Sequence, residues 1–321
     1  MRLGVYETDG MRAEGVIDAH RVHPLGRGDS IIGLLGSDAG DREHARARAL
    51  AQPGVPLADV SLRAPITPTS MRDFVCFETH VEGVVRMIDP DAQVMPDWYA
   101  APQFYFTNAT AIKGPGDPIE VPPGCERLDL ELELGIVIGT ACRDVTVEQA
   151  SQHIAGVTIY NDFSARDLAA RELRLSLGFA KAKDFANALG PWIVTIDELE
   201  PYRNGDRFDL EMSAYVNDRR LGVDTLANMA WSFEEMVVYA SRGTTLQPGD
   251  VLGSGTCGAG CLAELWGRNG SFEPPPLVAG DEVRLVVEGI GELTNHIVPG
   301  VAPIPVPNAR PRRTLPGEPI R

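Results

Sequence analysis

Cysteine is scarce in this sequence, with five thiols spread over 321 residues and no Cys-x-x-Cys pair among them. An odd number of scattered cysteines argues against a disulfide framework, and in a chain of this length it indicates reduced thiols in a cytoplasmic protein. Cys257 and Cys261 could be taken for a metal pair. No histidine lies near them in the sequence, so they are better interpreted as small residues of a Gly-rich turn.

Basic residues are also few, because 29 Lys and Arg face 45 Asp and Glu and leave a formal net charge of −16. Such a surface repels nucleic acid and anionic lipid, so we expect neither as a partner. Long apolar runs are missing too: residues 1–7 contain no signal core, and no run reaches the ~18 residues of a membrane span. Because the surface is acidic, a site for an anionic substrate would need positively charged residues of its own.

The chain length favours one large domain with a small accessory piece. Residues 1–68 hold short elements and end in a group of prolines that is typical of a boundary. Residues 69–304 would form the main domain, and the Pro- and Arg-containing residues 305–321 an extended tail. Predicted strands outnumber predicted helices and follow one another directly, so we expect a β-rich α+β fold and not a Rossmann type. The predicted strands lie at about 5–6, 31–35, 128–134, 157–160, 192–195, 210–216, 283–287 and 294–298, and the predicted helices at about 41–51, 73–82, 146–153 and 233–241.

Residues 128–134 carry the most informative pattern, Leu-Asp-Leu-Glu-Leu-Glu-Leu. Strict alternation predicts a strand with the leucines on one face and Asp129, Glu131 and Glu133 on the other. Glu131 and Glu133 then point the same way, about 7 Å apart along the strand. Like charges this close repel unless water or a cation separates them. Taken alone, the two glutamates are better explained as a solvated strand face, since acidic residues are mostly exposed.

Asp162 lies in a polar group, Tyr-Asn-Asp-Phe-Ser-Ala-Arg-Asp at 160–167, which follows an apolar predicted strand. Strand ends that gather varied polar groups are where sites tend to be built. By itself Asp162 is more simply a turn former. The polar residues around it favour a divalent metal site that Asp162 shares with Glu131 and Glu133.

A second pair, Asp73 and His80, would lie on one face of the helix predicted over 73–82, about 10 Å apart. One of them could reach a metal while the other stands a substrate's length away. In isolation, Asp73 is better explained as a favourable acid in a first helical turn, and His80 as a surface histidine. The other five histidines have no comparable polar company.

Positive charge and a partner for the histidine could come from later in the chain. Lys183 could supply the cation that an anionic substrate needs, although a surface lysine is the default interpretation. Glu264 lies in an apolar stretch where a lone carboxylate needs a partner, and a histidine would serve. The Gly-rich turn at 249–256 has neither the Walker-type spacing nor the GxGxxG fingerprint of nucleotide-binding loops, so we expect no nucleotide there.

Taken in order, these motifs resemble the fumarylacetoacetate hydrolase family. The spacing of Asp73 and His80 resembles that of the family's first metal ligand and its catalytic histidine. The resemblance implies a mixed β-sandwich or β-roll catalytic domain, a small N-terminal domain and a homodimer. The other matching pieces are Leu-Asp-Leu-Glu-Leu-Glu at 128–133, Asn-Asp-Phe-Ser-Ala-Arg-Asp at 161–167, Lys-Asp-Phe at 183–185 with Gly-Pro-Trp at 190–192, and Gly-Asp at 249–250 with Gly-Ser-Gly-Thr at 253–256.

Carried over residue by residue, the resemblance implies a metal site, a catalytic group and a substrate site. His80 would be the general base and Glu264 its orienting partner, with Lys183 assisting catalysis. Ala169 stands where the family often has a substrate-facing Gln, and the N-terminal segment is shorter than in the hydrolase that names the family. The implied metal ligands are Asp73, Glu131, Glu133 and Asp162, and the implied substrate contacts are Arg166, Lys183 and Thr256.

The implied chemistry follows from the ligand set. Carboxylates alone suit a hard divalent ion, Mg²⁺ first, with Mn²⁺ or Ca²⁺ as alternatives. The resemblance therefore predicts a hydrolase that cleaves a C–C bond in a β-diketo acid, acylpyruvate or fumarylacetoacetate-like, through a metal-bound enolate, with His80 and Glu264 activating water. A 2-oxo acid decarboxylase, tautomerase or hydratase that uses the same enolate is the alternative. A catalytically silent protein that only binds metal or an oxo acid is a third interpretation.

Overall fold

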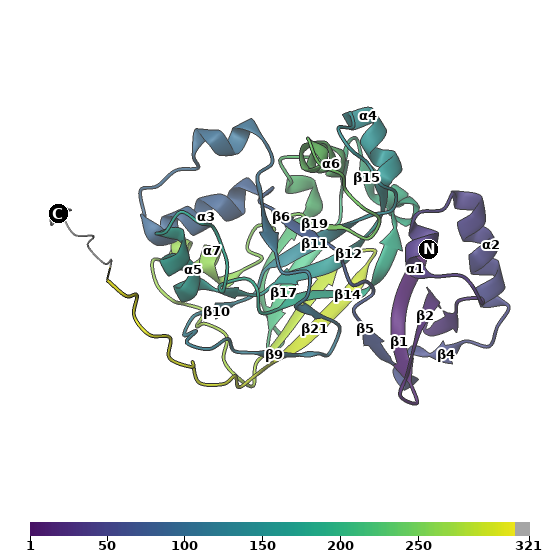
Figure 1. Ribbon diagram of the computed structural model, residues 1–321, viewed down its shortest axis with the longest axis horizontal. Helices are drawn as coiled ribbons and strands as arrows, with labels where there is room; N and C mark the ends of the chain where they lie inside the picture. The colour runs from purple at the N-terminus through teal and green to yellow at the C-terminus, as the bar shows by residue number, and fades with distance from the viewer. Residues whose placement is uncertain (312–321) are drawn as a thin grey trace, which may run out of the picture.

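Two β-sheets form the centre of the molecule in the computed structural model, which describes residues 1–311 (Figure 1). The larger sheet has 12 strands, in the order β4-β3-β2-β1-β14-β12-β11-β19-β6-β7, with β5 beside β1 and β8 beside β14. Its strands are β1 (Arg2–Thr8), β2 (Met11–Asp18), β3 (Arg21–Pro24), β4 (Val55–Pro56), β5 (Ser61–Arg63), β6 (Met71–Phe74), β7 (Phe104–Thr107), β8 (Ile112–Lys113), β11 (Leu132–Ile138), β12 (Ile154–Asp162), β14 (Asn187–Thr195) and β19 (Val251–Gly253).

The smaller sheet has five strands in the order β18-β17-β20-β21-β9, and two further pairs, β10–β13 and β15–β16, stand apart from both sheets. The strands of the smaller sheet are β9 (Pro118–Glu120), β17 (Glu211–Val216), β18 (Arg219–Thr225), β20 (Glu282–Val287) and β21 (Gly291–Val298). The separate pairs are β10 (Leu128–Asp129) with β13 (Ser164–Ala165), and β15 (Arg203–Asn204) with β16 (Arg207–Phe208).

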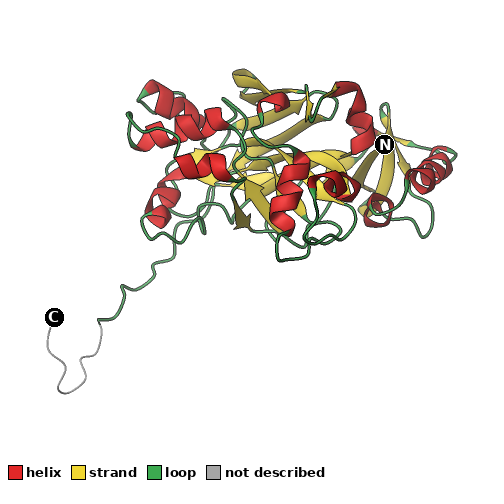
Figure 2. Cartoon of the chain, turned by 90° about the horizontal axis from the view of Figure 1, so that it is seen from above, coloured by secondary structure: helices red, strands yellow, loops and turns green. Residues whose placement is uncertain are grey.

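Helices surround the strands, which run through the interior of the molecule (Figure 2). Helices α3, α5 and α7 gather at one end, α4 and α6 lie together along another edge, and α1 and α2 belong to the N-terminal segment (Figure 1). The helices are α1 (Ile31–Leu35), α2 (Ala39–Leu50), α3 (Glu78–Ile88), α4 (Val147–Ala150), α5 (Arg166–Leu173), α6 (Phe233–Ser241) and α7 (Leu262–Asn269), with short 3₁₀ turns η1 (Leu57–Asp59), η2 (Pro96–Ala100), η3 (Ser151–His153), η4 (Ile196–Tyr202) and η5 (Leu226–Asn228).

The main core lies between the two sheets. Leu134 and Ile159 of the larger sheet belong to one buried cluster with Met212 and Leu285 of the smaller sheet and Val237 of α6. Successive side chains along a strand alternate between the two faces of a sheet, so each sheet can turn an apolar face toward the other, as a sandwich requires. The β-rich α+β fold expected from the sequence is confirmed.

The N-terminal segment continues the larger sheet. Strand β1 pairs with β14 in antiparallel register, with Leu3 opposite Ile193. A smaller cluster, which includes Val5, Leu34 and Ala45, covers this part of the sheet. Because the segment shares a sheet with the rest of the chain, a domain boundary at residue 68 stays a prediction.

The prediction of a strand over residues 31–35 is wrong, because these residues form helix α1. Ser30 caps the helix by accepting a hydrogen bond from the backbone N–H of Gly33 at 3.1 Å. Ile31, Leu34 and Leu35 are buried, at the i, i+3, i+4 spacing of a helical face. The cap and this spacing outweigh the β preference of the two isoleucines.

The predicted start of the next helix is also misplaced. Residues 71–74 form strand β6, which pairs with β19 on one side and β7 on the other, and the helix begins only at Glu78. Asp73 is therefore a strand residue, and the shared helical face predicted for Asp73 and His80 does not exist. Hydrogen bonding to two neighbouring strands outweighs the local helix signal at Ser70.

The strand predicted over 128–134 is divided into β10 and β11, and both of its faces are buried. A solvated acidic face, one of the two interpretations of this pattern, is thus excluded. Residues 299–311 contain no helix or strand and are exposed, as expected for a tail, while residues 312–321 of the predicted tail lie outside the described residues. Among the helices of residues 1–311, none is long and apolar enough to cross a membrane.

Candidate metal centre and active site

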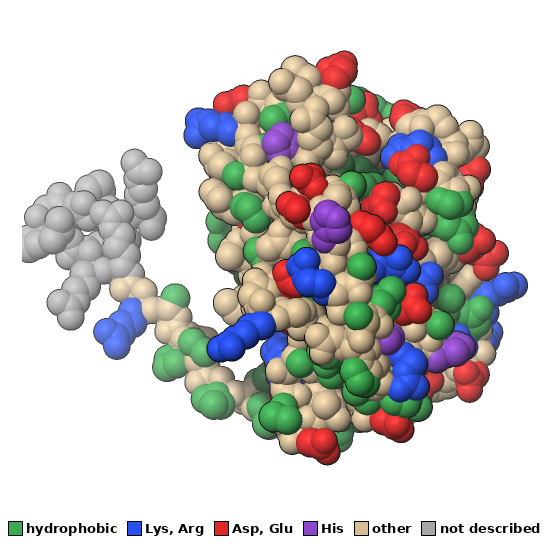
Figure 3. Space-filling view, turned by 90° about the vertical axis from the view of Figure 1, so that its right-hand side faces the viewer, with side chains coloured by type: hydrophobic (Ala, Val, Ile, Leu, Met, Phe, Trp, Pro, Cys, Tyr) green, Lys and Arg blue, Asp and Glu red, His purple; other side chains and the backbone are tan. Residues whose placement is uncertain are grey.

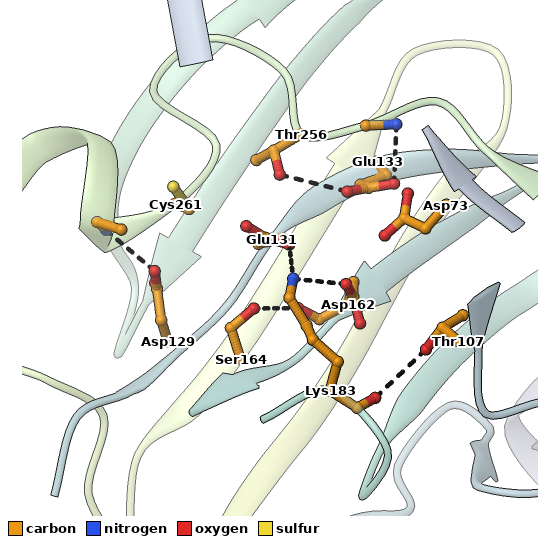
Figure 4. Close-up of polar contacts among 12 residues, drawn as sticks. Asp73, Thr107, Asp129, Glu131, Glu133, Asp162, Ser164, Lys183, Thr256 and Cys261 are labelled. Carbon is orange, nitrogen blue, oxygen red and sulfur yellow. Dashed lines mark hydrogen bonds and ion pairs between the residues drawn. The ribbon is translucent and has the colours of Figure 1, made fainter. Parts of the chain in front are cut away.

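Four buried carboxylates converge at the ends of β12, β11 and β6 (Figure 4). Oxygen atoms of Asp73, Glu131 and Glu133 lie within 4.8 Å of one another. Asp162 joins them through Tyr105, whose hydroxyl lies 2.6 Å from Asp73 Oδ2 and 2.5 Å from Asp162 Oδ2. The structure thus brings together all four residues that the sequence analysis predicted as metal ligands.

Sheet register explains this convergence. Strands β11 and β12 run antiparallel with Leu132 opposite Asn161, so Glu133 and Asp162 come to the same end of the sheet. On the other side of β11, Gly253 of β19 is paired with Asp73 of β6. A Cβ atom on Gly253 would stand 2.5 Å from Asp73 Oδ1 and 2.9 Å from Glu133 Oε2. Only glycine leaves the space in which these oxygens meet.

The electrostatics of the cluster show an excess of negative charge. Burial, followed by the neighbouring charge of Asp162, raises the pKa of Asp73 well above its usual range. Burial, followed by the charge of Asp73, does the same to the pKa of Glu133. Burial opposes ionisation of Glu131 as well, but Arg166 and Lys183 outweigh it and hold the pKa of Glu131 well below its usual value.

The cluster fits a hard divalent cation. Asp73 Oδ1 and Asp162 Oδ1 are buried and have no hydrogen-bond partner among the described residues, which is unusual for carboxylate oxygens. A dication would satisfy both atoms and would favour the ionised forms of Asp73 and Glu133. Ligands that are all carboxylate oxygens suit Mg²⁺, Mn²⁺ or Ca²⁺ better than softer metals.

Two buried cations border the cluster. The Lys183 ammonium donates to Glu131 and, at 2.6 Å, to Asp162 Oδ2, and Figure 4 shows it between these two carboxylates. Arg166 donates to Asp129 Oδ2 at 2.8 Å and to Glu131 Oε1 at 2.6 Å. Lys183, only 3% exposed, is therefore not the surface lysine of the default interpretation.

Asp129 has a role that its place in the alternating pattern did not reveal. Its two oxygens accept hydrogen bonds from the backbone N–H groups of Leu262 (2.7 Å) and Ala263 (3.0 Å) at the start of α7. A carboxylate at a helix N-terminus is favourable, and here it fixes α7 beside the site. Asp129 thus positions helix α7 and accepts a hydrogen bond from Arg166, whereas Glu131 and Glu133 belong to the carboxylate cluster.

His80 reaches the site because α3 and α7 approach very closely. A Cβ on Gly267 of α7 would lie 1.9 Å from the carbonyl oxygen of Gly83, and a Cβ on Gly83 of α3 would lie 2.3 Å from Glu264 Cγ. Glycine at both positions therefore lets the helix backbones touch. This contact places His80 of α3 beside Glu264 of α7.

The two ring nitrogens of His80 face different groups. Nε2 lies 3.8 Å from Glu131 Oε1, on the side of the carboxylate cluster. Nδ1 lies 3.8 Å from Glu264 Oε2 and 3.6 Å from the sulfur of Cys261. The predicted neighbours are brought together, although 3.8 Å is longer than a hydrogen bond. Cys261 has a histidine beside it in space although none is near in the sequence.

Glu264 and Thr256 are held by contacts of their own. Glu264 Oε2 accepts a hydrogen bond from the backbone N–H of Ala259 at 2.7 Å, and Oε1 pairs with Arg268. The Thr256 hydroxyl donates to Glu133 Oε1 at 3.2 Å (Figure 4). The three predicted substrate contacts all line the cavity described next, and they are Arg166, Lys183 and Thr256.

A cavity of about 150 Å³ opens onto the cluster. Its polar lining comes from Glu131 and Glu133 of the carboxylate cluster, both buried cations, His80 and Thr256. Its apolar lining comes from β6, α3 and β7 and from two loop residues, and these residues are Phe74, Val75, Val81, Val84, Val85, Tyr105 and Phe179. Tyr105 of β7 and Phe179, which lies in the loop after α5, border the site but were not predicted, because an isolated aromatic side chain gives no sequence signal of a site.

Comparisons with known proteins find related sequences and similar structures. Protein Rv2993c of Mycobacterium tuberculosis is 36% identical over 245 residues, which cover 76% of this chain and 80% of that protein. A 5-carboxymethyl-2-hydroxymuconate delta-isomerase from Mycobacterium smegmatis superposes with a TM-score of 0.69 at 29% identity, covering 93% of this chain and 100% of that one. A maleylpyruvate hydrolase from Sphingobium sp. SYK-6, solved in complex with manganese(II) ion and pyruvate, gives a TM-score of 0.69 at 25% identity, with 94% and 100% covered.

The family model described as fumarylacetoacetate (FAA) hydrolase, C-terminal, matches residues 69–298. This match includes all four carboxylates, both buried cations, and helices α3 and α7. The chain belongs to the fumarylacetoacetate hydrolase family.

Proposed function

We propose that the protein is a divalent-metal-dependent hydrolase that cleaves a C–C bond in a β-diketo acid of the acylpyruvate or fumarylacetoacetate-like kind. One observation carries the proposal: a cluster of four buried carboxylates, two with raised pKa values, lies beside a histidine whose other nitrogen faces a buried glutamate. The maleylpyruvate hydrolase with manganese and pyruvate supports the same class of chemistry.

Asp73, Glu131, Glu133 and Asp162 would hold the cation, with Mg²⁺ as the proposed ion. When bound, it supplies a Lewis acid that holds the oxygens of a dioxo acid and stabilises the negative charge formed when the C–C bond breaks. Lys183 and Arg166 keep Glu131 ionised and therefore keep the site able to bind a cation. Tyr105 holds Asp73 and Asp162 close together.

His80 would act as the general base through Nε2. Glu264 and Cys261 face Nδ1, and a proton on Nδ1 leaves Nε2 unprotonated on the side of the cavity. Nε2 takes a proton from water, and the water oxygen adds to the acyl carbonyl of the substrate. The bond between this carbonyl and the methylene carbon then breaks, its electron pair stays on the methylene side, and the proton returns there. The products are a carboxylic acid and a 2-oxo acid.

Lys183 and Thr256 are the proposed donors to the oxygen that becomes negative during the attack. Both line the cavity, although each donates to a carboxylate of the cluster in this structure. A well-placed donor to such an oxygen is worth roughly 3–4 kcal/mol in the transition state. The homodimer implied by the resemblance and the cytoplasmic location expected from the composition stay predictions.

An isomerase or decarboxylase acting on a 2-oxo acid is the second candidate. The similarity to the Mycobacterium smegmatis delta-isomerase favours it, and so does the 3.8 Å separation of His80 and Glu264, which is too long for a hydrogen bond. Hydrolysis requires His80 to activate water, whereas decarboxylation requires mainly the cation.

A substrate panel tests the proposal. The metal-free protein would be assayed with acylpyruvates, 2-oxo acids and the corresponding enols, with Mg²⁺ or with EDTA. We expect acylpyruvate cleavage that depends on Mg²⁺ and stops in EDTA. Equal turnover in EDTA would refute metal dependence, and loss of CO₂ or migration of a double bond without hydrolysis would favour the second candidate.

A further inference from the structure

The apolar part of the cavity lies on the side of helix α3. Val81, Val84 and Val85 line it from this helix, and all three are only partly buried in the described structure. Gly83 of the same helix packs against α7, and Val84 also contacts the main core. The valines therefore present apolar surface to a space that a ligand can occupy, at the end of the molecule where α3, α5 and α7 meet (Figure 1).

The position of His80 decides which part of a substrate meets these valines. His80 and Val84 are one turn apart on the same face of α3, a spacing that puts their Cβ atoms about 6 Å apart. In the proposed reaction His80 delivers water to the acyl carbonyl. The substituent on that carbonyl must then lie beside Val84.

The cations that line the cavity are already paired with carboxylates. Lys183 contacts Glu131 and Asp162, and Arg166 contacts Asp129 and Glu131. Among the described lining residues, these two and His80 are the only ones that can carry positive charge. The carboxylate of the 2-oxo acid end can meet the cation site and these groups, but a second carboxylate beside Val84 would lie against apolar side chains with no cation left to pair with it.

We infer that the physiological substrate carries an apolar acyl group, and is not a dicarboxylic acid. The three valines of α3 set this preference, because they present apolar surface where the acyl group would lie. This inference rests on the proposed function and restricts the class of substrate. Val84 is then a specificity-determining residue.

Two substrates of matched shape test the inference on the wild-type enzyme with Mg²⁺. 7-Methyl-2,4-dioxooctanoate ends in an isopropyl group, and 2,4-dioxoheptanedioate ends in a carboxylate of the same shape. We expect kcat/KM to be at least roughly tenfold higher for the isopropyl compound, because the isopropyl group contacts the valines of α3, whereas the carboxylate would lose water there without a charged partner. Equal rates, or a preference for the dicarboxylate, would overturn the inference while leaving the hydrolase proposal intact. Turnover of neither compound would overturn both.

A variant then locates the effect. Val84→Lys places a cation beside the acyl group, so the ratio of the two kcat/KM values should shift at least about tenfold toward the dicarboxylate. Val278→Lys adds the same charge at a residue that is 60% exposed and does not line the cavity, and should leave the ratio unchanged. An unchanged ratio in a folded Val84→Lys protein would show that the acyl group does not lie on α3.

Discussion

At the scale of single residues, His80 differs from the other histidines because both of its nitrogens face ionisable groups in a buried setting. We expect His80→Ala to lower kcat for acylpyruvate hydrolysis by roughly 10²–10⁴-fold, since a positioned base contributes about that much. Mg²⁺ affinity, measured by calorimetry, should stay the same because alanine removes no ligand. His296→Ala is the matched control, as His296 is exposed on β21 and should affect neither quantity. Full activity in His80→Ala would remove it from the mechanism.

Glu131 is the carboxylate of the cluster with the most positive surroundings, since both Arg166 and Lys183 contact it. Glu131→Gln keeps the shape but removes the charge, so we expect the affinity for Mg²⁺ to fall at least roughly tenfold. Asp129 and Asp162 still pair with the two cations, and the fold should persist. Calorimetry of the folded variant provides the measurement, with Glu120→Gln on the exposed edge of β9 as the control. An unchanged affinity would contradict the proposed ligand set.

At the scale of elements, the position of His80 depends on the contact between α3 and α7. A methyl group at Gly267 would lie 1.9 Å from a backbone oxygen, which cannot move without moving the helix. We expect Gly267→Ala to cost about 1–3 kcal/mol, as overpacking does, and to lower kcat because α3 shifts relative to Glu131. Thermal unfolding and the substrate assay measure the two effects.

The matched control is Gly40→Ala in α2, where an added Cβ would meet only the side chain of Asp38, at 3.3 Å. This change should leave activity intact and keep or raise stability, because alanine favours a helix over glycine. If Gly267→Ala were as stable and as active as the control, the close helix contact would not be what positions His80.

Elements with strong local signals could be predicted from the sequence. The helix expected over 233–241 is α6, with the same bounds, because Ser232 and Glu235 form a capping box at its start. The elements at 31–35 and 70–74 could not be predicted, since a cap in one case and strand pairing in the other outweighed the side-chain pattern. The carboxylate cluster lies between these extremes: alternation placed Glu131 and Glu133 on one face, but only the fold shows that this face is buried.

Several groups at the site depend on neighbours far along the chain, which no local pattern can reveal. Tyr105 contacts Asp73 and Asp162 across sequence separations of 32 and 57 residues. Cys261 meets His80 across 181 residues. The resemblance to a family supplied His80 and Glu264 as a pair, and the structure adds the helix contact that brings them together.

At the scale of the whole molecule, charge is distributed differently on the surface and in the interior. Acidic and basic side chains are interspersed over the face shown in Figure 3, which carries the N-terminal elements. The carboxylate cluster instead concentrates charge in a buried place, where Asp73 and Glu133 hold their protons to a higher pH than usual. Stability must therefore depend on both pH and the cation.

The direction in which stability changes with pH follows from the difference in proton binding between the folded and the unfolded protein. In the unfolded chain these carboxyls lose their protons near pH 4, whereas in the folded metal-free protein they keep them to higher pH. Their contribution to stability is thus complete below about pH 4 and is lost as the pH rises through the raised pKa values. Glu131, whose pKa is lowered, contributes in the opposite sense, but its contribution is lost only on acidification below its ordinary pKa. Above about pH 5, Asp73 and Glu133 determine the direction.

We therefore expect the melting temperature in EDTA to fall between pH 5 and pH 8, and Mg²⁺ to raise it more at pH 8 than at pH 5, because the cation binds the deprotonated carboxylates. At a concentration 100 times the dissociation constant the cation adds about 2.7 kcal/mol, which raises the melting temperature by roughly 4 °C for a chain of this size. Differential scanning calorimetry at both pH values measures the effect, and Glu133→Gln, which cannot ionise, should show a smaller fall in EDTA. If Mg²⁺ stabilised the protein equally at both pH values, the buried carboxylates would not be the groups that bind it.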